Sequence, residues 1–143
     1  MTPTVLAAPL ADLDPVTLYG ILRLRVDVFV VEQECAYPEL DGRDAEPATL
    51  HYWCVDESGT PIATARLLTD EFELRIGRVC VHGDHRGEGV TRVLLDRIVA
   101  DIGDRTSVLD AQAHLEQMYA RWGYTAYGPE FVEDGIPHIP MRR

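Results

Sequence analysis

The stretch 85-HRGEGVTR-92 stands between two apolar runs, IGRVCV at 76–81 and VLLDRIVADI at 93–102. The first run predicts a strand, and the apolar residues of the second recur at helical spacing. A strand that runs into glycines and then into a helix brings unpaired N–H groups to the positive end of a helix dipole. These donors favour a phosphate site, and glycines let the backbone approach the ligand closely.

Two glycines alone are more typical of an ordinary strand–turn–helix connection than of a phosphate site. The stretch lacks the G-K-[ST] ending of a Walker loop and the third glycine of a dinucleotide-binding fingerprint. The rest of the chain therefore has to decide between a phosphate loop and a simple turn.

The chain has 143 residues, of which 46% are hydrophobic, so it fits one domain, 1–143, with a sizeable core. No apolar run approaches the roughly 20 residues of a membrane span, and the N-terminus lacks a signal-peptide pattern. We therefore expect a cytoplasmic protein without a membrane partner. Three cysteines without a C-x-x-C pair indicate reduced, structural thiols.

The formal net charge of −11 argues against nucleic acid as a partner, because its phosphates would be repelled. The same charge is compatible with cationic small molecules.

Along the chain, turn formers and apolar periodicity alternate in a pattern typical of an α/β (α+β) layer fold. We expect helices at about 15–31, 93–102 and 112–122, and a long ordered loop at 35–50. Strands are predicted near 3–10, in a hairpin at 51–68, at 73–81 and at 106–111. The tail, 128–141, is predicted to consist of turns with one strand at most.

Four segments together resemble the GNAT N-acetyltransferases, and specifically their ElaA-like branch. RGEGVT (86–91) is similar to the signature Q/R-x-x-G-x-G/A, and QAHLEQMYARWGY (112–124) to the family's second motif. The branch is indicated by LRLRVDVFVVEQECAYPELDGRD (22–44) and EDGIPHIPM (133–141). The resemblance covers the chain from about residue 15 to 143.

The resemblance implies a mixed, mostly antiparallel twisted sheet with helices on both faces and central strands that splay to admit acetyl-CoA. The pantetheine arm would pair with the backbone of Val79, Cys80 and Val81 as an added strand does. The pyrophosphate would lie on the loop formed by Arg86, Gly87, Glu88, Gly89, Val90, Thr91 and Arg92.

Two positions depart from the family pattern. Thr91 replaces the usual glycine or alanine, and a threonine at a helix start still offers N–H and hydroxyl to a phosphate. Gln112 stands where many relatives carry asparagine, and its amide would hydrogen-bond the pantetheine arm.

The implied reaction is acetyl transfer to a primary amine by direct attack in a ternary complex, with the N–H of Val81 stabilising the oxyanion. Tyr119 matches the position of the acid that protonates the departing thiolate. An alkyl ammonium has a pKa near about 10.4 and needs a base. The candidates are Glu32 and Glu34, with Asp41 and Asp44 as further acids.

Several alternatives stay open. An acyltransferase similar to acyl-homoserine lactone synthases and a non-catalytic CoA-binding sensor both fit the pattern. The acceptor would be a small-molecule or peptide amine, and a homodimer is compatible with such folds. His82 and His85 form H-x-x-H without a third ligand, so we expect no metal. Arg25 is expected to pair with one of the loop acids.

Overall fold

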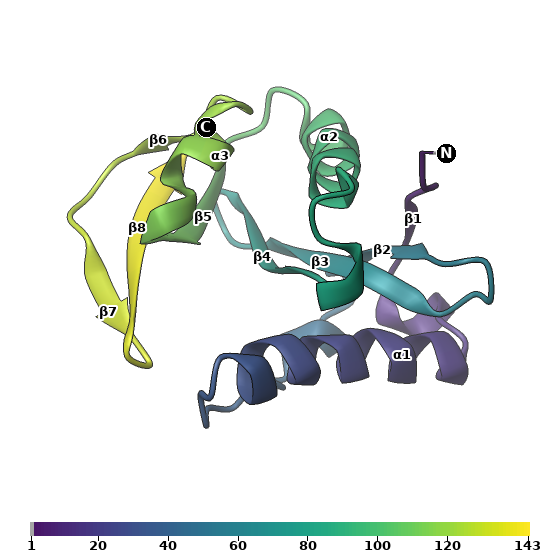
Figure 1. Cartoon of the computed structure of the whole chain (residues 1–143). Coiled ribbons are helices and arrows are strands. Elements are labelled where there is room, and N and C mark those ends of the chain that lie inside the picture. The colour runs from purple at the N-terminus through teal and green to yellow at the C-terminus, as the bar shows by residue number, and fades with distance from the viewer. Residues whose placement is uncertain (1) are drawn as a thin grey trace.

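The computed structural model describes residues 2–143, and its framework is a single eight-stranded sheet (Figure 1). The strands lie in the order β1-β2-β3-β4-β5-β8-β6, and β7 also pairs with β8. Among the strands of residues 2–143 only β4 and β5 pair in parallel, so the sheet is mixed and mostly antiparallel, as predicted. The strands are β1 (Leu6–Ala8), β2 (Leu50–Val55), β3 (Pro61–Thr69), β4 (Leu74–Val81), β5 (Ser107–Gln112), β6 (Thr125–Ala126), β7 (Phe131–Glu133) and β8 (Ile136–Arg142).

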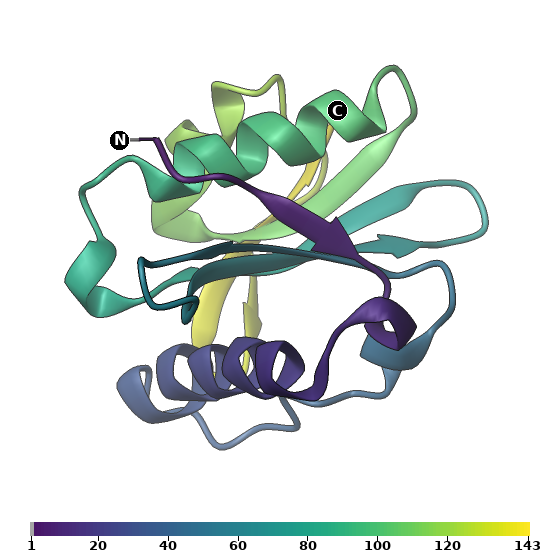
Figure 2. The ribbon, with the colours of Figure 1, turned by 90° about the vertical axis from the view of Figure 1, so that its right-hand side faces the viewer.

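Helices cover both faces of the sheet (Figure 2). On one face, α1 (Pro15–Val26) packs against β3 and β4. On the other face, α2 (Val90–Ile102) packs against β2, β3 and β4, and the short α3 (Glu116–Ala120) lies against β5 and β6. Among residues 2–143, no helix is long and apolar enough to cross a membrane.

The first helix begins where the sequence predicts and changes type before it ends. Asp14 caps α1 by accepting a hydrogen bond from the N–H of Thr17 at 2.9 Å. From Asp27 to Glu32 the chain continues as a π-helix, in which the N–H of Gln33 bonds the carbonyl of Val28 at 3.2 Å. The expected extent of 15–31 is confirmed, but an apolar pattern does not reveal such wide turns, which are frequent at functional sites.

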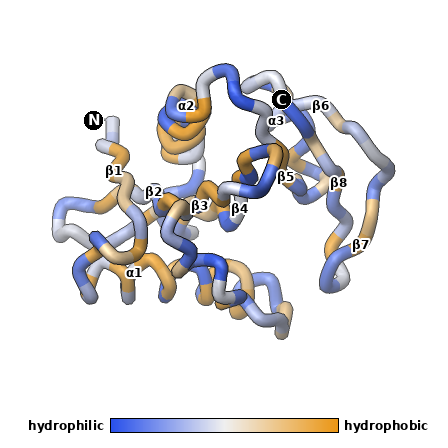
Figure 3. Tube along the Cα trace, turned by 180° about the vertical axis from the view of Figure 1, so that it is seen from behind, coloured by the Kyte–Doolittle hydropathy of each residue, from blue (hydrophilic) through white to orange (hydrophobic). Residues whose placement is uncertain are grey.

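The hydrophobic core has two parts, one on each side of the sheet. The larger part lies under α2, where apolar colouring is concentrated in the helix and the central strands (Figure 3). The smaller part, under α1, contains Leu24, Val28 and Cys80. Because side chains alternate along a strand, Cys80 faces α1 whereas its neighbour Val81 belongs to the α2 side.

Two expectations near the C-terminus were wrong. The helix expected at 112–122 shrinks to a 3-10 turn, Ala113–Leu115, followed by the five residues of α3. The tail at 128–141 holds two strands, β7 and β8, rather than one at most, and the short β6 precedes it.

Prolines obscured the longest of these strands, because a proline has no N–H to donate to a sheet. In β8, the carbonyl of Pro140 accepts from the N–H of Tyr127 at 3.0 Å, on the side away from β5. Its nitrogen therefore faces away from β5 too, and the β5–β8 ladder loses no bond.

Candidate active site

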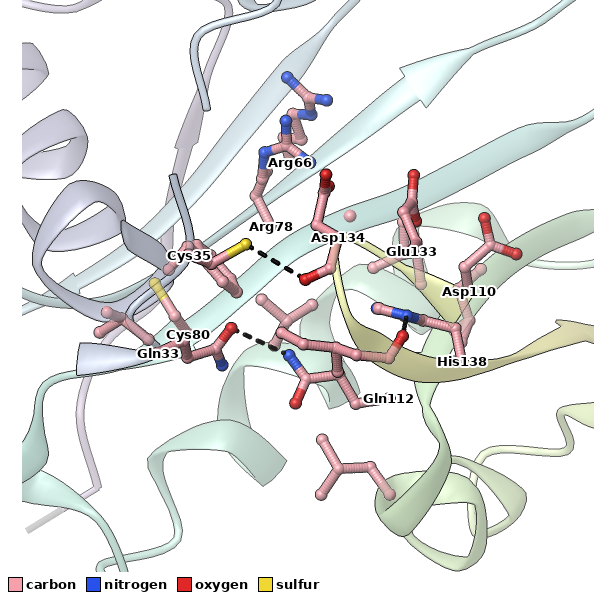
Figure 4. Close-up of a pocket in the computed structure, with 18 of the residues that line it drawn as sticks. Gln33, Cys35, Arg66, Arg78, Cys80, Asp110, Gln112, Glu133, Asp134 and His138 are labelled. Carbon is pink, nitrogen blue, oxygen red and sulfur yellow. Dashed lines mark hydrogen bonds between the residues drawn. The ribbon is translucent and has the colours of Figure 1, made fainter. Parts of the chain in front are cut away.

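A cleft opens where β4 and β5 diverge. The two parallel strands pair only at Leu74 with Ser107 and at Arg75 with Val108. Beyond these pairs lies a cavity of about 850 Å³, lined by residues 76–81 of β4 and by Leu109, Asp110 and Gln112 of β5 (Figure 4). The expected splaying of the central strands is confirmed.

A bulge in β4 directs backbone groups toward this cleft. The β3–β4 register shifts next to Arg78, whose φ is 54°. Beyond the bulge, the N–H of His82 donates to the carbonyl of Ile62 at 2.8 Å. Because bonded and non-bonded positions alternate along an antiparallel pair, Val81 turns its N–H and carbonyl away from β3. These groups therefore face the side on which β5 has separated.

The three residues expected to pair with a pantetheine arm, Val79, Cys80 and Val81, all line the cleft. Burial raises the pKa of the Cys80 thiol to about 12. At neutral pH this thiol is protonated and is a poor nucleophile. The Cys80 thiol is therefore not a candidate nucleophile in the cleft.

The glycine loop leads directly into α2. Gly87 and Gly89 have φ values of 82° and 81°, the left-handed conformation that glycine adopts without strain, and Gly89 is the N-cap. The carbonyl of Gly89 accepts the first helical bond, from Val93 at 3.3 Å. The N–H groups of residues 90–92 therefore precede the helical bonding pattern and point out of the helix end.

A second cavity of about 230 Å³ lies at this helix end and adjoins the main cleft. Of the loop residues expected to bind a pyrophosphate, six line it: Arg86, Gly87, Gly89, Val90, Thr91 and Arg92. Glu88 lies outside both cavities as the structure describes them, and its carboxylate is 3.3 Å from Nδ1 of His85. The structure thus places the loop's backbone and its two arginines, but not Glu88, at the cavity.

Two predicted site residues contact each other across the cleft mouth. Arg86 donates from Nη1 and Nη2 to the Glu32 carboxylate at 2.7 and 2.8 Å, and from Nε to the carbonyl of Val81 at 3.1 Å. The hydrogen bonds from Arg86 lower the pKa of Glu32. The end of the π-helix and the start of the glycine loop are therefore joined by one ion pair.

Tyr119 lies on α3 with its side chain in the cleft wall and is 6% exposed. Burial, with a smaller contribution from Tyr124, raises the pKa of its phenol to about 12. The hydroxyl therefore keeps its proton at neutral pH, as a general acid requires.

Glutamine side chains bridge the cleft. Gln112, at the end of β5, donates from Nε2 to Oε1 of Gln33 at 3.4 Å (Figure 4). Gln33 follows the π-helix and was missed by the sequence analysis, since nothing in its context distinguishes it from a surface glutamine. Glu34, the next residue, has a φ of 50° and lies outside the cleft lining of the described chain, whereas Glu32 lies within it.

A network of ion pairs reaches the cleft, which two of its members, Asp41 and Arg66, line. Arg25 is 1% exposed and donates to Asp44 at 2.7 Å and to Glu39 at 2.6 Å, which confirms its expected pairing with a loop acid. Arg66 extends the network by donating to Asp44 at 3.1 Å and to Asp41 at 2.7 Å. The expected ordered loop at 35–50 is thus held on the sheet by charge.

No cluster of three histidine, cysteine or acidic side chains suited to a metal ion occurs within residues 2–143. His82 and His85 have ring centroids 6.0 Å apart, and each contacts an acid of its own loop, Asp84 and Glu88.

Comparison with known proteins agrees with the cleft and the glycine loop. A family model described as an acetyltransferase (GNAT) domain matches residues 25–143. The chain belongs to the GNAT acetyltransferase family. A UPF0039 protein of Mycobacterium tuberculosis is 48% identical over 136 residues, which cover 92% of this chain and 87% of the relative. This GNAT membership supports an acyl-CoA N-acyltransferase activity.

Solved structures place the chain in the ElaA-like branch. Escherichia coli ElaA is 34% identical with a TM-score of 0.92, and the match covers 99% of both chains. An acyl-CoA N-acyltransferase from Pseudomonas aeruginosa is 38% identical with a TM-score of 0.94, again over 99% of both chains. A CoA-dependent acyl-homoserine lactone synthase is 16% identical with a TM-score of 0.79, covering 99% of this chain and 82% of that one, a likeness of fold alone.

Proposed function

We propose that this GNAT protein transfers an acetyl group from acetyl-CoA to a primary amine of a small molecule or peptide, by direct attack in a ternary complex. The observation that carries the proposal is the continuity of the two cavities. One is lined by Val79 and by Val81, whose backbone faces outward, and the other surrounds the N-terminus of α2. Acetyl-CoA has groups that fit both cavities. The amides of its pantetheine arm would pair with the strand backbone, and its pyrophosphate would bind at the helix N-terminus.

The residues of this chain divide the binding between them. The N–H groups of residues 90–92, with the charges of Arg86 and Arg92, would hold the pyrophosphate. The backbone of Val79, Cys80 and Val81 would pair with the pantetheine amides, and Gln112 would add its side-chain amide. This arrangement would place the thioester between Val81 and Tyr119.

The reaction requires the acceptor nitrogen to lose two protons and the sulfur to gain one. The acceptor ammonium gives a proton to a base, for which we assign Glu32 rather than Glu34, because Glu32 lines the cleft. The amine nitrogen then bonds to the thioester carbon while the N–H of Val81 stabilises the charge on oxygen. As the C–S bond breaks, the sulfur takes the proton of Tyr119, and the phenolate left behind takes the second proton of the nitrogen, which yields the neutral amide, the free CoA thiol and Tyr119 in its starting form.

A turnover screen with release of free CoA as readout tests this function. Acetyl-CoA is offered with amines of several classes, including polyamines, amino-acid amides and peptides, and propionyl- and octanoyl-CoA serve as longer donors. We expect acetyl- and propionyl-CoA to react and octanoyl-CoA to fail. Efficient octanoyl transfer with S-adenosylmethionine, giving a lactone, would contradict the proposal, and so would a failure of every amine.

A further inference from the structure

The ion pair between Arg86 and Glu32 uses the same donors that a phosphate would need. The two terminal nitrogens of Arg86 donate hydrogen bonds to the Glu32 carboxylate at 2.7 and 2.8 Å, and Nε donates to the carbonyl of Val81 at 3.1 Å. This bidentate geometry suits carboxylates and phosphates alike. An anion that binds at the glycine loop therefore meets an arginine that already has an anionic ligand.

The position of the pair joins the two cavities. Arg86 lines both of them, whereas Glu32 lines only the main cleft. Both side chains are partly exposed, at 45% and 48%, so the pair can open without breaking the core. Exposed ion pairs are weakly stabilising, and a pyrophosphate carries more charge than a carboxylate.

We propose that Glu32 competes with the pyrophosphate of CoA for Arg86, and that cofactor binding thereby releases the Glu32 carboxylate to receive the acceptor amine. This inference rests on the proposed function. It makes Glu32 a residue that senses the cofactor, because its carboxylate is held by Arg86 until the pyrophosphate takes over the guanidinium. Cofactor binding then precedes productive binding of the amine.

Titration of CoA into the purified full chain, followed by calorimetry, tests the competition. Glu32→Gln keeps the shape of the side chain and removes the charge that grips Arg86, so CoA should bind about two- to fivefold more tightly. Asp27→Asn is the matched control, because Asp27 lies on the same π-helix but pairs with Arg23 at 3.8 Å. Unchanged or weaker CoA binding by Glu32→Gln would overturn the inference.

A double-mutant cycle separates direct competition from a general effect of charge. Arg86→Ala should weaken CoA binding, and adding Glu32→Gln to Arg86→Ala should then have no further effect on the dissociation constant. A persistent gain in affinity without Arg86 would mean that Glu32 merely repels the cofactor. Thermal melting of each variant verifies that it is folded.

Turnover measurements test whether the released Glu32 carboxylate takes part in the reaction with the amine. With the best amine of the screen, Glu32→Gln should lower kcat/KM for the amine by about tenfold or more, although it binds CoA more tightly. Tighter CoA binding with an unchanged kcat/KM would refute the release. If the wild type transfers acetyl to no amine, the proposed function fails, whereas the CoA titrations still decide whether Glu32 and the cofactor compete.

Discussion

The phenol of Tyr119 is the group to which the family resemblance assigns protonation of the departing thiolate. Burial keeps it protonated at neutral pH. Tyr119→Phe retains the ring and deletes the acid, so we expect kcat to fall by about 10²–10⁴-fold while the dissociation constant of CoA is unchanged. Steady-state kinetics with the best amine and calorimetry with CoA measure the two quantities.

The control for this substitution is Tyr124→Phe. The hydroxyl of Tyr124 is 2.7 Å from Oγ of Ser107, so its removal costs a buried hydrogen bond, and Tyr124 makes only the smaller contribution to the raised pKa of Tyr119. Loss of stability with normal kcat is expected. Full turnover by Tyr119→Phe would assign the acid to water or to another residue.

A second residue-scale prediction concerns stability. Asp44 accepts hydrogen bonds from Arg25 and Arg66, whose side chains are 1% and 5% exposed. Asp44→Asn removes the negative charge that the buried guanidinium groups of Arg25 and Arg66 share. We therefore expect the free energy of unfolding to fall by about 3–5 kcal/mol. Urea denaturation followed by circular dichroism measures the change.

The matched control is Asp70→Asn, which breaks a more exposed pair with Arg43, 2.6 Å long. We expect a loss of about 1 kcal/mol or less. Equal effects of the two substitutions would show that burial does not govern the strength of this network.

At the scale of elements, the junction between the glycine loop and α2 is the proposed pyrophosphate site. A Cβ at Gly89 meets no atom within 4 Å, but the φ of 81° strains any other residue. Gly89→Ala should therefore lose about 1–2 kcal/mol of stability and also bind CoA more weakly, because the methyl group stands between the backbone and the pyrophosphate.

Gly59→Ala controls for the strain. Gly59 has a φ of 85° in the β2–β3 turn and is likewise open around its Cβ position. The same loss of stability with unchanged CoA affinity is expected. If both variants bind CoA as the wild type does, the phosphate-loop assignment is wrong.

For the whole molecule, the lowered pKa values of three buried or ion-paired side chains predict how stability depends on pH. Burial lowers the pKa of His51, whose Nε2 is 3.1 Å from the carbonyl of Asp44. Hydrogen bonds from Arg66 lower the pKa of Asp41. For Asp44, burial raises the pKa, but its two partners Arg25 and Arg66 lower it by more, so the net shift is downward. In each case the unfolded chain takes up protons first as the pH falls, so acid destabilises the fold.

We expect Tm to decline below about pH 6.5, where unfolded histidine is protonated, and more steeply below about pH 4, where unfolded aspartate is protonated. Calorimetric melting between pH 3 and 8 measures both slopes. His51→Gln should flatten the upper slope and leave the lower one. A Tm that rises as the pH falls from 6.5 would contradict the lowered pKa of His51.

Much of the architecture and part of the site were predictable from local sequence. Apolar periodicity located α2 and the β2–β3 hairpin, and the glycines of 85-HRGEGVTR-92 marked the helix N-terminus, because helix periodicity and turn chemistry are local properties. The motif of 112–124 likewise pointed to Tyr119. These features depend on residues within a few positions of one another.

Only the tertiary structure decided which distant residues meet. Glu32 and Arg86 are 54 residues apart, and Gln33 reaches Gln112 across 79 residues. The β8 strand was hidden by prolines whose tolerance depends on which side of the strand has a partner. Such contacts follow from the packing of α1 and the β5–β8 arm around the splayed strands, since a cleft is a property of the assembled layers rather than of any one segment.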